Sequence, residues 1–282
     1  MGLCFWKDAL VGCVSKVGLV ALRNSRTPLS ITFSVWKALF LREAVFRLST
    51  GRAAWMWLLL EPVIVIIFHL FWYSTVHIGT IGGMNIAVWF MLGMSGFFMF
   101  RRTGLQSINA IDANKTLFSY RQVKPVDTVL VRACLEGFLM TVTLIILCIA
   151  VGLYGLDIIP TDPLMAFAAL CGMWLVGLGF GLIFSVAREL VPEVGKFIDL
   201  SMLPLYFMSG ILFPINIVPE PYYDWLLFNP LIHGAEIMRL SFAPVYQAAP
   251  GLSISYLYGF ALTTIFFGLA LHSRFAARMM TQ

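Results

Sequence analysis

Charged residues are scarce in this sequence. Of its 282 residues, 19 are Lys or Arg and 14 are Asp or Glu, so charged residues make up 12% of the chain, whereas hydrophobic residues make up 60%. A soluble domain carries about 25% charged residues. The deficit leaves too little polar surface to cover a water-soluble globule, and it therefore indicates an integral membrane protein.

Cysteine is scarce as well, and no pattern of catalytic or metal-binding residues accompanies it. The five cysteines form no CxxC pair and have no histidine at metal-ligand spacing, so we expect neither a zinc site nor a disulfide framework. The four histidines (His69, His77, His233 and His272) are scattered, which argues against a membrane-embedded enzyme. We therefore predict no metal, no cofactor and no catalytic site in this chain.

The sequence also lacks a nucleotide-binding loop. The Gly195-Lys196 pair is followed by Phe197, and Leu190 stands where a P-loop has its first glycine. If the chain takes part in active transport, the energy must come from a partner or from an ion gradient.

Long apolar segments, in contrast, are abundant. Six of them approach the roughly 20 residues that a helix needs to cross the hydrocarbon core. They cover about residues 53–76, 84–100, 129–156, 164–187, 197–213 and 255–275. Helix is expected because a lone strand exposed to lipid cannot satisfy its backbone hydrogen bonds. The predicted fold is an all-α integral membrane protein with six transmembrane helices, the second of which ends at Arg101-Arg102.

Basic residues fall on one side of these segments. Of the 19 Lys and Arg residues, only Arg239 lies in a connection on the other side. Because lysine and arginine are enriched in cytoplasmic connections, both termini are predicted to be cytoplasmic.

Two regions outside the six segments are expected to be helical. Residues 31–49 predict an interface helix within a cytoplasmic N-terminal segment, residues 1–52, that precedes a transmembrane domain, residues 53–282. Residues 214–251 are too apolar for an ordinary loop and too rich in proline to span the bilayer. We expect two short re-entrant helices there, dipping into the outer leaflet.

Several short motifs resemble those of a known family in their order and spacing. They are Arg42-Glu43, Arg47, Gly51, Trp55, Glu61-Pro62, Asn109, Asn114, Val123-Lys124-Pro125, Asp127, Ser209-Gly210, Pro219, Asn229-Pro230 and Arg239. From about Ile31 to the C-terminus, the chain resembles the ABC-2 type export permeases, and within them the capsular polysaccharide exporters of Gram-negative bacteria.

The resemblance implies a function, a location and partners. Two permease chains would form a homodimer in the bacterial inner membrane, and two separate ATPase subunits, which bind ATP and magnesium, would dock on its cytoplasmic side. The cargo would be a lipid-linked acidic polysaccharide, passed on to a periplasmic adaptor and an outer-membrane pore. Membrane lipid is a further expected partner, and nucleic acid is not.

Three groups of site residues follow from these expectations. For ATPase coupling we name Arg42, Glu43, Asn109, Asn114, Leu117, Tyr120 and Lys124. For the substrate path we name Arg47, Arg52, Trp55, Glu61, Phe68, Trp72, Tyr73, Phe90 and Phe97, in which arginines would hold phosphate or acidic sugars and aromatic rings would stack on sugars. For an outer gate we name Asn229, His233, Glu236 and Arg239, which share a broad face on a helix.

Each group also has a structural alternative. The coupling loop could be a plain cytoplasmic loop, the arginines could anchor to anionic lipid, the aromatic rings could be core packing, and the Glu236–Arg239 pair could be a packing salt bridge. Glu61, inside the first span, should face the bundle interior or pair with an arginine such as Arg52, and Glu136 and Asp199 merit the same attention.

Other functions remain open from the sequence. The same transporter class also exports O-antigen and teichoic acid, and the neighbouring genes would tell these apart. From another class, a proton-coupled carrier could use Glu61 and Asp199, and an uncoupler would then stop it.

Overall fold

The computed structural model describes residues 28–49, 54–75, 79–119, 122–219, 222–248 and 250–281. The chain divides into two compact units, Met1–Ala38 and Leu39–Gln282, and the candidate site lies in the second.

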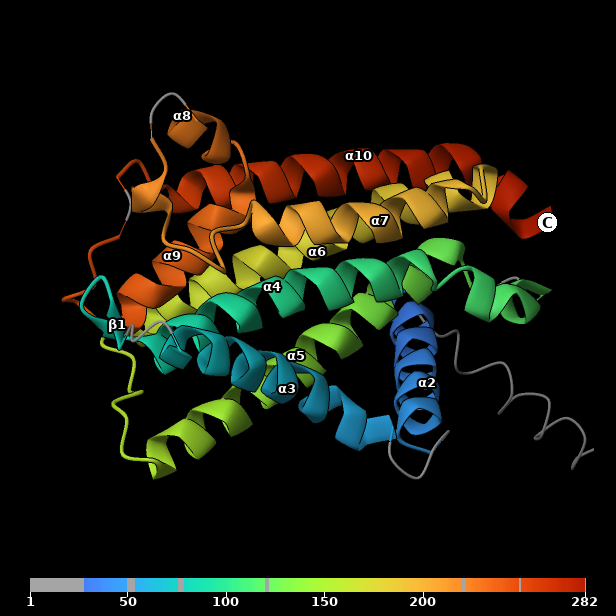
Figure 1. The fold of residues 1–282 in the computed structure, drawn as a ribbon. Coiled ribbons are helices and arrows are strands. Elements are labelled where there is room, and N and C mark those ends of the chain that lie inside the picture. The colour runs from blue at the N-terminus through green and yellow to red at the C-terminus, as the bar shows by residue number, and fades with distance from the viewer. Residues whose placement is uncertain are drawn as a thin grey trace, which may run out of the picture. The chain divides into compact units, whose positions relative to one another are not determined.

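The described residues are mostly helical (Figure 1). The long helices are α2 (Pro28–Ser49), α3 (Ala54–Thr75), α4 (Ile86–Ile108), α5 (Pro125–Leu153), α6 (Pro163–Leu190) and α10 (Ile254–Thr281). The shorter elements are β1 (Thr80–Ile81), β2 (Met84–Asn85), the 3-10 helix η1 (Asp112–Ser119), α7 (Val194–Phe207), the 3-10 helix η2 (Ile215–Ile217), α8 (Tyr222–Leu226) and α9 (Pro230–Phe242).

Three of the described helices are long and apolar enough to cross a membrane. They are Pro125–Leu153, Pro163–Leu190 and Ile254–Met279, and Leu60–His69 is a shorter apolar stretch. Large apolar side chains such as Phe138 and Phe266 are exposed on these helices, as expected for surfaces that meet lipid or another chain. The expectation of a helical fold with apolar spans is thus confirmed for three helices, and the count of six spans stays a prediction.

Side-chain caps set the starts of several helices. Asp162 accepts a hydrogen bond from the Met165 backbone amide (3.0 Å) ahead of α6, and Asn229 accepts one from the Leu231 amide (3.0 Å) ahead of α9. A proline follows each cap at the first helical position, where its missing N–H leaves no hydrogen bond unmade.

Helix α6 lies at the centre of the bundle, packed between α4 and α10 (Figure 1). Its glycines permit this packing: a Cβ at Gly177 would lie 2.8 Å from the Phe100 carbonyl oxygen of α4. Helix α4 supplies much of the core, and its Trp89, Phe90 and Leu92 side chains are fully buried.

The antiparallel helices give the second unit two distinct ends. The "η1 end" holds η1, the end of α4, the start of α5 and the end of α6, and the "hairpin end" holds β1, β2, α8 and α9 (Figure 1). In the β1–β2 hairpin, Thr80 pairs with Asn85 and Ile81 pairs with Met84. Gly82 and Gly83 form its two-residue turn with φ of 58° and 88°, values that glycine adopts without strain.

The helix boundaries correct three expectations. Helix α4 does not end at Arg101-Arg102 but runs on to Ile108, because paired arginines on one face do not interrupt backbone hydrogen bonding. Helix α7 ends at Phe207 instead of continuing to residue 213, since Gly210 turns the chain with φ of 64°. Helix α10 continues past residue 275 to Thr281.

The other expected elements are present. The helix predicted at residues 31–49 is α2, and the two short helices predicted within residues 214–251 are α8 and α9, accompanied by η2. Their placement in the membrane interface and in the outer leaflet stays a prediction, as does the domain boundary at residue 52.

Candidate functional site

The η1 end holds a network of polar side chains that joins the second half of α2 to η1 and α5. Arg42 donates a hydrogen bond to the side-chain oxygen of Asn114, whose amide in turn donates to the Ala110 carbonyl (2.7 Å). The next residue of α2, Glu43, forms an ion pair with Arg132 of α5 (2.8 Å). Both carboxylate and guanidinium are nearly buried, so α2 is held to the bundle by charge-assisted contacts.

The same network extends to the end of α6. Asn109 accepts hydrogen bonds from two arginines, at its carbonyl from Arg132 (3.0 Å) and at its side chain from Arg188. Lys115 of η1 forms ion pairs with Asp112 (3.0 Å) and with Glu189 of α6 (2.8 Å). We call the residues of these contacts the η1-end network: Arg42, Glu43, Asn109, Asp112, Asn114, Lys115, Arg132, Arg188 and Glu189.

The contacts of the η1-end network change the pKa of Lys115. The Glu189 carboxylate, followed by that of Asp112, raises the pKa of Lys115 above its usual value of 10.5. The ammonium group is therefore charged at every physiological pH, and η1 keeps its attachment to α6.

The residues predicted to couple to an ATPase divide into two kinds. Asn114 and Glu43 are buried, so their side chains support the network and are not open to a partner in this conformation. Leu117 is half-buried and Lys124 is exposed. Lys124 precedes α5, and its backbone amide donates to Asp127 (3.1 Å) in a helix cap. Tyr120 lies outside the described residues.

Glu61 of α3 pairs with two consecutive arginines of α4. One carboxylate oxygen lies 3.1 Å from Arg101 Nη1, and the other lies 2.5 Å from Arg102 Nη2. The expectation of an arginine partner for Glu61 is confirmed, whereas the suggested partner, Arg52, lies outside the described residues. We call Glu61, Arg101 and Arg102 the arginine–glutamate cluster.

The aromatic residues of the predicted substrate path do not form one ladder. Phe90 and Phe97 are buried in the core, where Phe90 packs against Trp89 and Phe97 packs against Tyr206, and their place in a substrate path stays a prediction. Phe68 and Trp72 are about two-thirds exposed at 62% and 63%. The side chains of Arg47, Trp55 and Tyr73 lie outside the described part of the chain.

A polar contact links α3 to α7 beside these rings. The Tyr206 hydroxyl of α7 lies 3.1 Å from His69 Nε2 of α3, and His69 Nδ1 lies 2.7 Å from the Val65 carbonyl. Because a neutral imidazole has one donor and one acceptor nitrogen, this geometry is satisfied when Nδ1–H donates to Val65 and Nε2 accepts from Tyr206.

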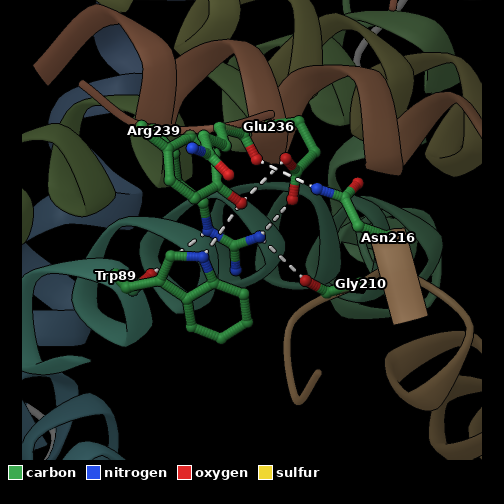
Figure 2. A network of polar contacts seen from close by, with 7 residues as sticks. Trp89, Gly210, Asn216, Glu236 and Arg239 are labelled. Atoms are coloured by element: carbon green, nitrogen blue, oxygen red, sulfur yellow. Dashed lines mark hydrogen bonds and ion pairs between the residues drawn. The ribbon is translucent and has the colours of Figure 1, made fainter. Parts of the chain in front are cut away.

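At the hairpin end, a buried cluster surrounds Arg239 of α9 (Figure 2). Its guanidinium donates to Glu236 (2.6 Å) and to the Gly210 carbonyl (2.9 Å), and lies 3.6 Å from the Trp89 ring centroid in a cation–π contact. The arginine is 0% exposed and fits because Gly93 of α4 has no side chain: a Cβ there would overlap the guanidinium.

Tyr246 completes this hairpin-end cluster, which consists of Trp89, Glu236, Arg239 and Tyr246. Its hydroxyl donates to Glu236 (2.9 Å) and accepts from Trp89 Nε1 (3.0 Å). Burial, above all, raises the pKa of Tyr246 to about 12, so the hydroxyl keeps its proton and donates to the carboxylate at neutral pH.

The contacts expected among the predicted gate residues are therefore partly present. The Glu236–Arg239 ion pair exists, and His233 is buried on the same helix. Asn229, however, is the cap of α9 and not part of its face, because Pro230 begins the helix. Whether these residues open and close stays a prediction.

The other two carboxylates named from the sequence lie in different environments. Glu136 is fully buried on α5, whereas Asp199 is exposed on α7. Within the described chain, no group of three or more His, Cys, Asp or Glu side chains could hold a metal ion.

Sequence reasoning missed the residues that pair across helices. These residues are Arg101, Arg102, Arg132, Glu189 and Tyr246. One signal could have found Arg102: a carboxylate in a span, such as Glu61, requires a partner, and Arg102 lies about as far from the end of α4 as Glu61 lies from the start of α3.

Comparison with known proteins places these features in context. The sequence model of the family described as ABC-2 type transporter matches residues 34–243. The chain is 35% identical to the polysialic acid transport protein KpsM of Escherichia coli over 245 residues, which cover 87% of this chain and 95% of KpsM.

More distant relatives carry similar names. The capsule polysaccharide export inner-membrane protein CtrC of Neisseria meningitidis serogroup A is 28% identical, over 73% of this chain and 77% of CtrC. The capsule polysaccharide export inner-membrane protein BexB of Haemophilus influenzae is 26% identical, over 75% of this chain and 80% of BexB.

Proposed function

Because this chain belongs to the family of ABC-2 type transporters, we propose that it is the membrane permease subunit of an ATP-driven exporter of acidic capsular polysaccharide. The observation that carries this function is the 35% identity to a polysialic acid transport protein along 95% of that protein's length. A likeness of this extent covers most of the chain, not a shared motif alone.

The proposed topology follows from the charge of the two ends. Six spans, formed by α3, α4, α5, α6, α7 and α10, cross the inner membrane, and α8 and α9 enter the outer leaflet without crossing it. The η1 end, which carries Lys115, Arg132 and Arg188, faces the cytoplasm together with both termini. The hairpin end, with Arg239 fully buried, faces the periplasm.

The η1 end is the proposed docking surface for the ATPase. Its support is mechanical: α2 is held to η1 by Arg42 and to α5 by Glu43, and η1 is held to α6 by Lys115. A force applied to η1 or α2 would therefore reach two long helices of the bundle. Exposed residues of η1, such as Thr116 and Ser119, are free to meet a partner surface.

The complete exporter is proposed to contain two copies of this chain and two ATPase subunits. ATP and magnesium bind in the ATPase, in keeping with a sequence that has no P-loop of its own. A periplasmic adaptor and an outer-membrane pore receive the lipid-linked cargo, and nucleic acid takes no part.

A gene deletion in the native host tests this function. Loss of the gene should remove acidic polysaccharide from the cell surface and leave it inside the cell, and a plasmid copy should restore it. ATP depletion should stop export, whereas a proton uncoupler that leaves ATP intact should not. A deletion strain with normal surface capsule but altered O-antigen would show that the chain exports a different glycan.

A further inference from the structure

The arginine–glutamate cluster has one more positive charge than negative charge. Arg101 and Arg102 each bond to one oxygen of the same carboxylate, and within the described part of the chain Glu61 is the one ion-pair partner of either arginine. A guanidinium has five N–H donors, and each of these uses one on Glu61. Most donors of the pair therefore remain available to another acceptor.

The cluster lies within the bundle and not at its rim. Arg102 is six residues before the end of α4, and Glu61 is seven residues after the start of α3. At 1.5 Å per residue, both lie about 10 Å from the ends of their helices. Both arginines follow directly on the apolar run of α4, so the extra positive charge lies beside the apolar part of the bundle, and an anion bound there offsets it.

The cluster is also accessible. The side chains of Arg101 and Glu61 are 36% and 27% exposed, so a ligand from outside the chain can reach them. The Arg101 guanidinium lies over the Phe98 ring, 6.0 Å from its centroid.

Glu61 lies at a point where helix α3 can bend. Pro62 follows it inside the helix, and proline supplies no N–H to the carbonyl four residues earlier. The backbone next to Glu61 thus lacks one of the hydrogen bonds that hold a helix straight. A movement of this carboxylate away from the arginines breaks two partly exposed ion pairs, which are weaker than fully buried ones.

We propose that Arg101 and Arg102 form an anion-binding site in which Glu61 is an exchangeable counter-ion. A phosphate or carboxylate group of the ligand displaces the Glu61 carboxylate and accepts hydrogen bonds from the two guanidiniums, whose fork geometry suits such groups. The identification of this ligand as an acidic group of the cargo rests on the proposed function. A phospholipid headgroup offers the same chemistry.

Binding to the full-length chain in phosphatidylcholine nanodiscs tests the site with two probes. One is an oligomer of sialic acid, and the other is phosphatidylglycerol added to the nanodisc. Glu61→Gln removes the competing carboxylate and should tighten binding of the probe by about tenfold. Arg101→Gln with Arg102→Gln should weaken it by at least about tenfold. Arg274→Gln, at an exposed cation of α10, is the matched control and should bind as the wild type does.

The outcomes separate the possible answers. Tighter binding by Glu61→Gln of either probe supports the anion site, and the probe that responds identifies the source as glycan or lipid. If Glu61→Gln binds both probes no better than the wild type, the cluster is an ordinary salt bridge between helices and the proposal is overturned. Arg101→Lys with Arg102→Lys keeps both positive charges but loses the fork geometry of the guanidiniums. This double variant controls for misfolding caused by loss of charge, and it should bind with intermediate affinity.

This test can fail independently of the proposed function. If deletion of the gene abolishes capsule export while the variants bind anions equally, the anion site alone is refuted. If the variants respond as expected but the deletion strain exports capsule normally, the export function alone is refuted.

Discussion

Replacing Arg239 by methionine removes the cation of the hairpin-end cluster and leaves the Glu236 carboxylate buried. The wild-type guanidinium bonds to Glu236 at 2.6 Å and to the Gly210 carbonyl at 2.9 Å, and it lies 3.6 Å from the Trp89 ring centroid. The side chains of Arg239 and Glu236 are 0% and 2% exposed, so water cannot take the place of the missing partner.

The magnitude follows from this burial. Removal of one member of a buried ion pair destabilises a protein by about 3–5 kcal/mol, because the remaining charge has no partner. For a domain of this size, each kcal/mol lowers the melting temperature by about 2–4 °C. Arg239→Met should therefore lower it by about 6–20 °C, measured by heating the detergent-solubilised protein and quantifying the monodisperse fraction.

A second variant isolates the ion pair from the packing. Glu236→Gln combined with Arg239→Met leaves no buried charge, and the introduced amide keeps an oxygen that can accept from Tyr246. We expect the double variant to be more stable than the sum of the two single effects by about 2–3 kcal/mol. Arg274→Met, at an exposed position, should melt as the wild type does. If Arg239→Met also melted within about 1 °C of the wild type, the buried pair would not stabilise this end of the bundle.

Two further substitutions test the η1 end and the bundle core. Glu43→Gln breaks the ion pair that holds α2 to Arg132. Co-purification of the ATPase should therefore fall several-fold, while membrane insertion is unchanged. Normal recovery of the ATPase would contradict a role of this contact in docking. Gly177→Val places side-chain atoms against the Phe100 carbonyl of α4 and should lower stability by about 1–3 kcal/mol in the same melting assay. Gly259→Val is the control and should have little effect, because a Cβ at Gly259 meets nothing within 4 Å.

Local sequence features predicted most of the fold. Apolar runs of sufficient length located the long helices, and capping residues followed by proline, at Asp162 and Asn229, mark their starts. The Glu236–Arg239 pair was predictable for the same reason, because residues three apart on a helix are neighbours. Helix ends were less predictable: a run of apolar residues marks the hydrocarbon, and α4 and α10 continue beyond it as polar helix.

Contacts between distant residues were not predictable from such patterns. Arg42 and Asn114 are 72 residues apart, and Glu61 and Arg102 are 41 apart. Their pairing depends on how the helices cross and rotate, which neither length nor composition specifies. The aromatic residues illustrate the same limit, since Phe90 and Phe68 occupy similar apolar runs, yet one is buried in the core and the other is exposed.

The central claim is that the η1 end faces the cytoplasm and the hairpin end faces the periplasm. Single cysteines at two exposed positions, Thr116→Cys in η1 and Val245→Cys near the hairpin, test it in a variant without the native cysteines. With a membrane-impermeant maleimide, intact spheroplasts should label only Val245→Cys, and Thr116→Cys should react only after the membrane is opened. Labelling of Thr116→Cys in intact spheroplasts would place the proposed docking surface outside the cell and contradict the central claim.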